Sequence, residues 1–355
     1  MSHPSSELRW DPLERRWALI APGRSQRPLD FKPTPRPVVD RTTTPCPFCL
    51  ILTGQETQTQ IAERRVRDAT EPHLDEDVVL VLANRFPILS IDTPPTRTTM
   101  GPYVSMSGVG AHEVVVETAK HGLTLRAMSD TQRQHVLSMW RDRADDLTRD
   151  HRIAHVQIFK NEGPKAGASL EHSHSQVVAS PICPPRIERQ LDAARAHYHA
   201  TQRCLTCDML DVEAQPHTGH RLVDSEGPFI AWCPYASARP FEVHIAPKAH
   251  TARFTLSDDE ALSLSKLLGR VLRALDVALA GADINLVFDL PPSPTRLDDL
   301  VAASWHWRLE LLPRLLPYGG FELGTDIHIN PTAPEDAAAR LRALVATGPR
   351  PAVPT

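Results

Sequence analysis

Two passages of the chain have similar patterns of hydrophobic and polar residues. They span residues 112–121 and 241–250, and in each a glutamate precedes a terminal histidine, His121 or His250, by eight residues. Hydrophobic side chains at every second position predict strands that end shortly before these histidines. The alternating residues are Val114 and Val116 in the first passage, and Val243 and Ile245 in the second.

A helix is predicted after each passage. Ser129–Gln132 and Ser257–Glu260 have the pattern of a capping box, in which side chains satisfy free backbone N–H groups at a helix start. Hydrophobic residues follow at helical spacing, so both helices are expected to face the core. The residues are Val136, Trp140 and Leu147 in the first helix, and Leu264, Leu267, Leu268, Val271, Leu272 and Leu275 in the second.

Strands are predicted again after each helix, at His155–Phe159 and Ser175–Ser180 and later at Ile284–Phe288 and Trp307–Leu312. Each half therefore has the order C-x-x-C, strand, His, helix, strand, and a strand that carries His-x-polar. The repeated order predicts an internal duplication. We expect an α+β fold with two tandem halves, each an antiparallel sheet with a helix packed on it.

The duplication predicts three units, namely residues 1–190, residues 191–345 and a tail at residues 346–355. Before the first C-x-x-C pair, the segment Pro22–Pro47 is rich in proline and predicts an extended arm.

Composition excludes several classes of protein. The 355 residues include 39 basic and 43 acidic side chains, and the net charge of −4 argues against a polybasic nucleic-acid-binding protein. No run of 18 apolar residues exists and the first residues do not resemble a signal peptide, so we expect no membrane span and a cytoplasmic location.

Four of the six cysteines form two C-x-x-C pairs, and each pair has two histidines at corresponding places further along its half. Four nitrogen or sulfur ligands suit a structural zinc ion, so two Zn²⁺ per chain are predicted. Redox-active pairs and unligated thiols remain alternatives, and Cys183 and Cys233 have no assigned role. The candidate ligands are Cys46, Cys49, His121 and His172 in the first half, and Cys204, Cys207, His250 and His306 in the second.

The segment around His172 combines several features of a phosphate-transfer site. If His172–Val178 is a strand, His172, His174 and Gln176 share one face. Gly163 and Gly167 would make the preceding loop flexible enough for its amides to approach a phosphate. A neutral imidazole can attack phosphorus, so we assign His172 to zinc, His174 to nucleophilic attack, and Gln176 to holding a phosphoryl oxygen.

Alignment of the two halves supports this division of roles. When His306 is placed on His172, Arg308 falls on His174 and Glu310 falls on Gln176. The second half keeps the predicted metal ligand and lacks the nucleophile, so only the first half is expected to be active.

Gly167–Gln176 resembles the active-site segment of the galactose-1-phosphate uridylyltransferases, a branch of the histidine triad superfamily whose fold is a tandem pair of α+β halves. The resemblance extends over most of the chain. Further segments that carry it are Asp11–Leu13, Ala21–Pro28, Asn84–Pro87, Gly319–Glu322 and Ile329–Pro331.

The resemblance implies a two-step nucleotidyl transfer from a nucleotide sugar, with a nucleotidyl-histidine intermediate on His174. Hexose 1-phosphate or phosphate would be the acceptor, and a homodimer is implied. His174 and Gln176 would be catalytic, Cys46, Cys49, His121 and His172 would hold zinc, and the substrate contacts would be Arg24, Arg27, Asn84, Asn161, Ser169, Glu322 and His328.

Three functions follow. The first is a UDP-glucose:hexose-1-phosphate uridylyltransferase. The second is an adenylyltransferase that uses phosphate as acceptor, because Ser173 and the second C-x-x-C pair resemble the ADP-glucose phosphorylase-like subgroup, and His328 stands where the uridylyltransferases have glutamine. The third is a non-catalytic, zinc-stapled nucleotide-binding module.

Overall fold

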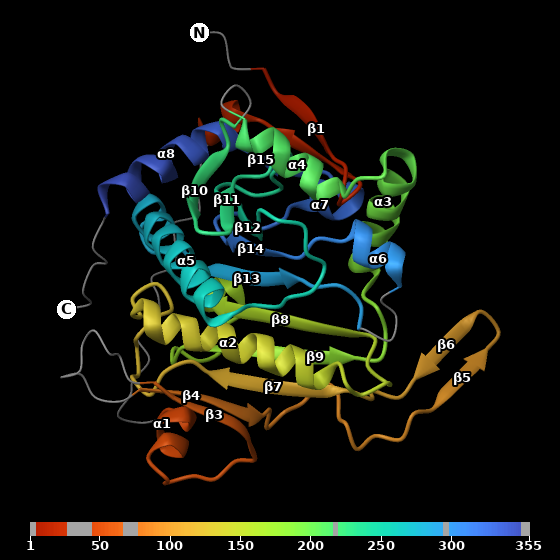
Figure 1. Ribbon diagram of the computed structural model, residues 1–355, viewed down its shortest axis with the longest axis vertical. Coiled ribbons are helices and arrows are strands. Elements are labelled where there is room, and N and C mark those ends of the chain that lie inside the picture. The colour runs from red at the N-terminus through yellow and green to blue at the C-terminus, as the bar shows by residue number, and fades with distance from the viewer. Residues whose placement is uncertain (1–4, 27–44, 67–76, 216–218, 294–297, 349–355) are drawn as a thin grey trace.

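A computed structural model describes residues 5–26, 45–66, 77–215, 219–293 and 298–348. Ten strands form one sheet in the order β10-β11-β12-β14-β13-β8-β9-β7-β4-β3 (Figure 1). All of its neighbouring strands are antiparallel. The strands are β3 (Gln60–Val66), β4 (Asp77–Ala83), β7 (Ala111–Val116), β8 (His155–Glu162), β9 (His174–Ser180), β10 (Leu222–Glu226), β11 (Phe229–Trp232), β12 (Val243–Pro247), β13 (Ile284–Asp289) and β14 (Arg308–Pro313).

The strand order confirms the internal duplication. Counted from the middle outward, the first half runs β8-β9-β7-β4-β3 and the second half runs β13-β14-β12-β11-β10. The halves meet where β8 pairs with β13, and Phe159 lies opposite Val287. These two residues are equivalent, because Phe159 also pairs with Gln176 and Val287 also pairs with Glu310. A local twofold axis therefore relates the halves at this junction.

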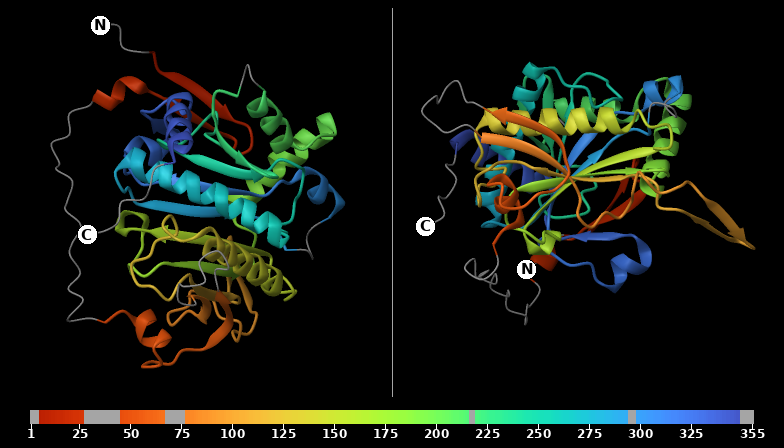
Figure 2. Two further views of the ribbon diagram at one scale, coloured as in Figure 1. Left: turned by 60° about the vertical axis from the view of Figure 1, so that its left-hand side comes forward. Right: turned by 90° about the horizontal axis from the view of Figure 1, so that it is seen from below.

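Two long helices, α2 (Asp130–Leu147) and α5 (Asp258–Leu279), lie side by side on one face of the sheet (Figures 1 and 2). The predicted hydrophobic stripes of both helices enter the main core, except that Leu147 is only partly buried at its edge. Burying such side chains contributes about 1.5–3 kcal/mol each, so the two helices stabilise this face of the sheet.

One predicted capping box is confirmed and the other is wrong. Ser257 and Glu260 bond reciprocally at the start of α5. Ser129 accepts the amide of Gln132 as an N-cap, but the Gln132 side chain does not return to Ser129. It donates to the carbonyl oxygen of Glu117 at 2.5 Å instead, because Gln132 is buried beneath the end of β7.

The opposite face of the sheet carries shorter elements. The helix α1 (Pro47–Leu52) packs through Phe48 on β4 and β7. The strands β1 (Glu7–Asp11) and β2 (Arg16–Ile20) form a separate sheet with β15 (His328–Asn330). The remaining elements are η1 (Pro22–Gln26), β5 (Arg97–Met100), β6 (Tyr103–Met106), η2 (Pro164–Ala166), α3 (Pro185–Thr201), α4 (Leu205–Ala214), α6 (Asp299–Ser304), α7 (Gly320–Thr325) and α8 (Pro334–Thr347).

The two similar passages do not match residue for residue in the fold. Val114 and Val116 face α1, whereas Val243 and Ile245 face α5. The alternation is correct in both strands, but the equivalence is offset by one residue, because a one-residue shift turns every side chain to the other face. His244, which pairs with Glu310, is therefore the counterpart of Val114, which pairs with Gln176.

Two further expectations are adjusted. The predicted strand at His172 begins at His174, so His172 and Ser173 precede it. Pro22–Gln26 forms a short helix rather than the start of an extended arm, and residues 27–44 lie outside the described part of the chain. Among the described residues, no helix has the length and hydrophobicity needed to cross a membrane.

Candidate active site and metal centres

The first Cys/His cluster forms where α1 meets the ends of β7 and β9. Cys46 is the N-cap of α1 and Cys49 lies one turn later, so both thiols project from one helix start. The Sγ atom of Cys49 lies 3.4 Å from Nδ1 of His121 and 3.5 Å from Nδ1 of His172, and the Sγ atom of Cys46 lies 3.7 Å from His172 Nδ1. All four predicted ligands are thus brought together.

These distances fit a tetrahedral metal ion. Zinc–sulfur and zinc–nitrogen bonds of about 2.3 and 2.0 Å place the ligand atoms about 3.3–3.8 Å apart at the corners of a tetrahedron. His172 presents Nδ1 to the thiols because its Nε2 faces the backbone oxygen of Thr118 at 2.8 Å. Burial lowers the pKa of His172, which keeps the ring in the neutral form that binds metals.

The second cluster repeats this arrangement. Cys204 is the N-cap of α4, and Cys207 Sγ lies 3.5 Å from Nδ1 of His250 and 3.4 Å from Nδ1 of His306. The Nε2 atom of His306 faces the oxygen of Pro247 at 3.0 Å, as His172 faces Thr118. Hydrogen bonds from Cys207, and also from the two histidines, lower the pKa of Cys204, which favours a thiolate ligand. Both clusters can therefore hold a metal ion.

His174 begins β9, directly after the first cluster. Its Nδ1 donates to the backbone oxygen of His172 at 2.8 Å, which places the proton on Nδ1 and leaves the lone pair on Nε2. Burial, and secondly the nearby Lys160 ammonium, lower the pKa of His174. The ring is therefore neutral near pH 7 and has a nitrogen available for attack.

Ser173, which distinguishes this segment, belongs to a buried network under His174. Its hydroxyl donates to Glu117 Oε2 at 2.7 Å, and Lys160 Nζ donates to the same carboxylate oxygen at 2.8 Å. Lys160 also donates to Ser173 Oγ at 3.0 Å and to the backbone oxygen of His174 at 3.1 Å. Three bonds satisfy the ammonium, so its role is to fix the chain at His174.

Two side-chain amides lie near the start of β9. Gln176 is two residues from His174 on the same face of the strand. Asn161, at the end of β8, accepts a hydrogen bond on Oδ1 from Asn285 Nδ2 at 2.8 Å, and its own Nδ2 faces the Gly167 turn. Asn84 lies beside His112 at the start of the adjoining loop, with its Nδ2 3.0 Å from His112 Nε2.

Several backbone amides in the loop before His172 are hydrogen-bonded within the chain, whereas the sequence predicted amides that could approach a phosphate. The amides of Ala166 and Ala168 donate to the oxygen of Gly163, and the amide of Lys165 donates to the Asp283 carboxylate at 2.6 Å. These groups are therefore already bonded. Ser169 is exposed further along the same loop.

Three predicted substrate contacts lie elsewhere. Arg24 is exposed in η1. His328 pairs with β2, and Glu322 accepts the Gly319 amide at the start of α7. The strand β15, which carries His328, lies beside the second half, because Asn330 Nδ2 donates to the backbone oxygen of Ser237 at 3.1 Å. Arg27 lies outside the described residues.

In the second half, charged residues replace the candidate transfer residues. Strand pairing makes Asp289, Arg308 and Glu310 the counterparts of Asn161, His174 and Gln176. Arg308 and Arg186 form ion pairs with the buried carboxylates of Asp289, Glu310 and Glu14. The three carboxylates converge, but the guanidinium groups between them make this a salt-bridge network rather than a cation site.

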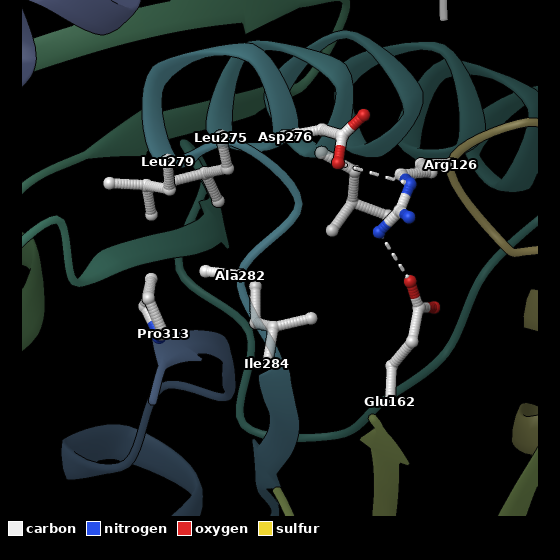
Figure 3. A pocket seen from close by; sticks show the side chains of 9 residues that line it. Arg126, Glu162, Leu275, Asp276, Leu279, Ala282, Ile284 and Pro313 are labelled. Atoms are coloured by element: carbon white, nitrogen blue, oxygen red, sulfur yellow. Dashed lines mark hydrogen bonds and ion pairs between the residues drawn. The ribbon is translucent and has the colours of Figure 1, made fainter. Parts of the chain in front are cut away.

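A surface pocket near the C-terminal end of α5 lies apart from these sites (Figure 3). Arg126 bridges Glu162 at 2.8 Å and Asp276 at 3.4 Å there. The residues that line this pocket include no Cys or His, and the Arg126 guanidinium is already paired with two carboxylates. We therefore assign the pocket no role in the reaction.

Sequence reasoning missed four residues, namely Glu117, Lys160, Asn285 and His112. Glu117 and Lys160 are polar residues in strand or strand-end positions whose neighbours are buried, which is the pattern that points to a buried network. His112 contacts Asn84 and Gln176, and its position at the start of a hydrophobic strand was visible in the sequence.

The duplicated α+β fold holds a buried histidine, His174, beside the first of two Cys/His clusters, and comparison with known proteins identifies the class as nucleotidyltransferase. A family model described as "Galactose-1-phosphate uridyl transferase, N-terminal domain" matches residues 2–184. The chain belongs to the galactose-1-phosphate uridyl transferase family. The protein is therefore an enzyme, and the prediction of a non-catalytic nucleotide-binding module is not supported.

Relatives with two different reactions are similar to this chain. It is 32% identical to an ADP-glucose phosphorylase of Arabidopsis thaliana, covering 98% of this chain and 95% of the relative. It is 31% identical to a galactose-1-phosphate uridylyltransferase of Thermotoga maritima, covering 95% and 98%. The crystal structure of an Arabidopsis ADP-glucose phosphorylase with bound ADP-glucose has a TM-score of 0.78 at 31% identity, covering 95% of this chain and 99% of that one.

Proposed function

We propose that this protein transfers a nucleoside monophosphate from a nucleotide sugar to a phosphate-bearing acceptor through a covalent intermediate on His174. The observation that carries the proposal is the bond from His174 Nδ1 to the oxygen of His172, which leaves Nε2 as the nucleophile. The second half, which folds in the same way, has Arg308 at this position.

The reaction proceeds in two displacements. The lone pair of His174 Nε2 attacks the α-phosphorus, a nitrogen–phosphorus bond forms, and the bond from that phosphorus to the bridging oxygen breaks. Hexose 1-phosphate leaves with the electron pair. A phosphate oxygen of the acceptor then attacks the same phosphorus, and the electron pair of the nitrogen–phosphorus bond returns to His174.

Amide donors next to His174 stabilise the charge that develops on the phosphoryl oxygens. Gln176 and Asn161 are within the same strand-end region, and Ser169 adds a hydroxyl from the exposed loop. Asn84 contacts the nucleotide from the adjoining loop. Arg24, Arg27, Glu322 and His328 are proposed to contact substrate phosphates and the hexose.

Two zinc ions per chain complete the proposal. Cys46, Cys49, His121 and His172 would hold the first, and Cys204, Cys207, His250 and His306 would hold the second. The first ion, when bound, stabilises the chain segment that carries His174, because His172 is two residues away. The second stabilises the corresponding segment of the inactive half.

UDP-glucose with hexose 1-phosphate as acceptor is the first candidate substrate pair. ADP-glucose with inorganic phosphate is the second, and two observations favour it. The second Cys/His cluster is complete, and Ser173, which resembles the same subgroup, is integrated into a buried network. The similarity to a structure with bound ADP-glucose points the same way.

Trapping of the intermediate distinguishes the candidates. The protein is incubated separately with UDP-glucose and ADP-glucose labelled at the α-phosphorus, and the acid-labile adduct is counted. We expect label from one donor, its loss in His174→Asn with metal content retained, and its discharge by hexose 1-phosphate or by phosphate. Label from neither donor would contradict the mechanism. Size-exclusion chromatography with light scattering tests the proposed homodimer.

A further inference from the structure

A histidine outside the proposed transfer machinery lies between two of its amides. His112 is on β7, and it shares a sheet face with Gln176 because Val114, two residues away, pairs directly with Gln176. His112 Nε2 lies 2.8 Å from Gln176 Oε1 and 3.0 Å from Asn84 Nδ2. The ring therefore joins the candidate catalytic strand to the loop that begins at Asn84.

The other ring nitrogen fixes the tautomer of His112. The backbone amide of Ile88 donates to Nδ1 at 3.3 Å, so Nδ1 must carry a lone pair. In a neutral imidazole the proton then lies on Nε2. That proton is donated to Gln176 Oε1, which is the acceptor atom within 2.8 Å.

This bond determines which way the Gln176 amide points. A free carboxamide can turn by 180° and present either oxygen or nitrogen to a ligand. Because His112 occupies Oε1, the NH₂ group of Gln176 faces away from His112 and remains available for a phosphoryl oxygen. The opposite orientation would direct a carbonyl oxygen at the phosphate and repel it.

The same tautomer affects Asn84. A protonated Nε2 has no lone pair to accept a bond, so the nearby NH₂ group of Asn84 remains available for a ligand. The Asn84 amide cannot turn over, because its Oδ1 accepts the backbone amide of Phe86 at 2.8 Å. One histidine therefore leaves two amide donors oriented and available.

Comparison of the two halves argues against a purely structural role. The counterpart of Gln176 is Glu310, and strand register places Glu242 at the position of His112. Glu242 accepts a bond from His244 and belongs to the charged region of the second half. Since β12 and β14 pair without a His–Gln bond at the equivalent position, the pairing of these strands does not require one.

We propose that His112 is a positioning residue for nucleotidyl transfer: its Nε2–H holds Gln176 Oε1 so that the Gln176 NH₂ group faces the transferred phosphoryl group. The inference rests on the proposed function, in which Gln176 stabilises the phosphoryl oxygens.

The test compares His112→Phe and His112→Gln in single-turnover formation of the labelled His174 adduct. We expect His112→Phe to lower this rate about 10- to 100-fold, below the roughly 10²–10³-fold loss typical of deleting an oxyanion donor outright. Substrate affinity should change less than the rate. His112→Gln, which keeps a donor near the Nε2 position, should recover part of the rate. His151→Phe, at an exposed histidine, is the matched control.

A double-mutant cycle separates positioning from general structural damage. In a Gln176→Ala background, His112→Phe should cost little further rate, because the amide that it orients is gone. Multiplicative losses, or an unchanged rate in His112→Phe, would overturn the inference while the wild-type adduct still forms. Absence of the wild-type adduct would instead overturn the proposed function, and the inference with it.

Discussion

Lys160 and Glu117 form an ion pair of 2.8 Å that is almost completely shielded from solvent, with side-chain exposures of 2% and 0%. The pair lies under the strand end that carries His174, and Lys160 also binds the backbone oxygen of that residue. In the second half, Phe288 takes the position of Lys160. At this equivalent position, the first half is thus stabilised by a buried ion pair, and the second half has a buried hydrophobic side chain instead.

Removing one partner of this pair should destabilise the protein strongly. Lys160→Met leaves a buried carboxylate without its counter-ion, and such losses are typically about 3–5 kcal/mol. Urea denaturation measures the free energy of unfolding. The double variant Lys160→Met with Glu117→Gln removes both charges, so its loss should be smaller than the sum of the single losses. If the loss in the double variant equalled the sum of the two single losses, Lys160 and Glu117 would not be energetically coupled.

Metal content should respond separately at the two clusters. Cys49→Ser and Cys207→Ser should each remove one zinc ion per chain, because each takes away one of four ligands. Cys183→Ser, outside both clusters, is the control. Atomic-emission spectrometry gives the metal content and the labelled adduct gives activity. Cys207→Ser should keep more activity than Cys49→Ser, since His174 adjoins the first cluster. The reverse order would contradict the assignment of the active half.

The free energy of unfolding should decrease as the pH is lowered, because of His155. This side chain is fully buried, and burial lowers its pKa from the usual 6.5 to about 4. Between these values the unfolded chain binds a proton and the folded chain does not, so stability present above pH 6.5 is lost as the pH falls toward 4. The linkage predicts a loss of about 2 kcal/mol between pH 7.5 and 5. His155→Gln should flatten this part of the curve, and an unaltered slope would refute the assignment.

Gly163 should not tolerate a side chain. Its φ is +89°, and an added Cβ would lie 2.3 Å from the Asp283 carboxylate, which accepts the Lys165 amide. Gly163→Ala should therefore displace the loop before His172 and lower both stability and adduct formation. Gly348→Ala is the comparison, because Gly348 also has a positive φ, +57°, but lies in the ordinary left-handed region with nothing within 4 Å of the added Cβ. It should cost only the backbone strain, about 1–2 kcal/mol. Equal effects in the two variants would exclude the steric argument.

Much of the fold could be predicted from the sequence because periodicity and order carry it. The predicted strands at His155 and Ile284 are observed with extensions of only a few residues, and both long helices begin after their predicted serine caps. The members of both Cys/His clusters could be selected from the sequence because C-x-x-C places two thiols on one turn, and the repeat then points to the histidines.

Contacts between distant segments could not be predicted in this way. The one-residue offset between the strands at Val114 and Val243 depends on which helix each valine faces. The two passages are similar in sequence, so the offset cannot be detected from the sequence alone. The bonding of Lys160 to Glu117 joins β8 to the end of β7. Likewise, two glycines suggested a loop with free amides, but Asp283 from the other half accepts the Lys165 amide.

The junction at Phe159 and Val287 has an evolutionary consequence. Equivalent strands that pair antiparallel about a twofold axis form the contact that two identical chains make in a symmetric dimer. Fusion of such a dimer into one gene removes the requirement that both copies have the same sequence. In a fused chain, a change in one copy leaves the other copy unchanged, so the second copy can carry ion pairs centred on Arg308 where the first copy carries His174.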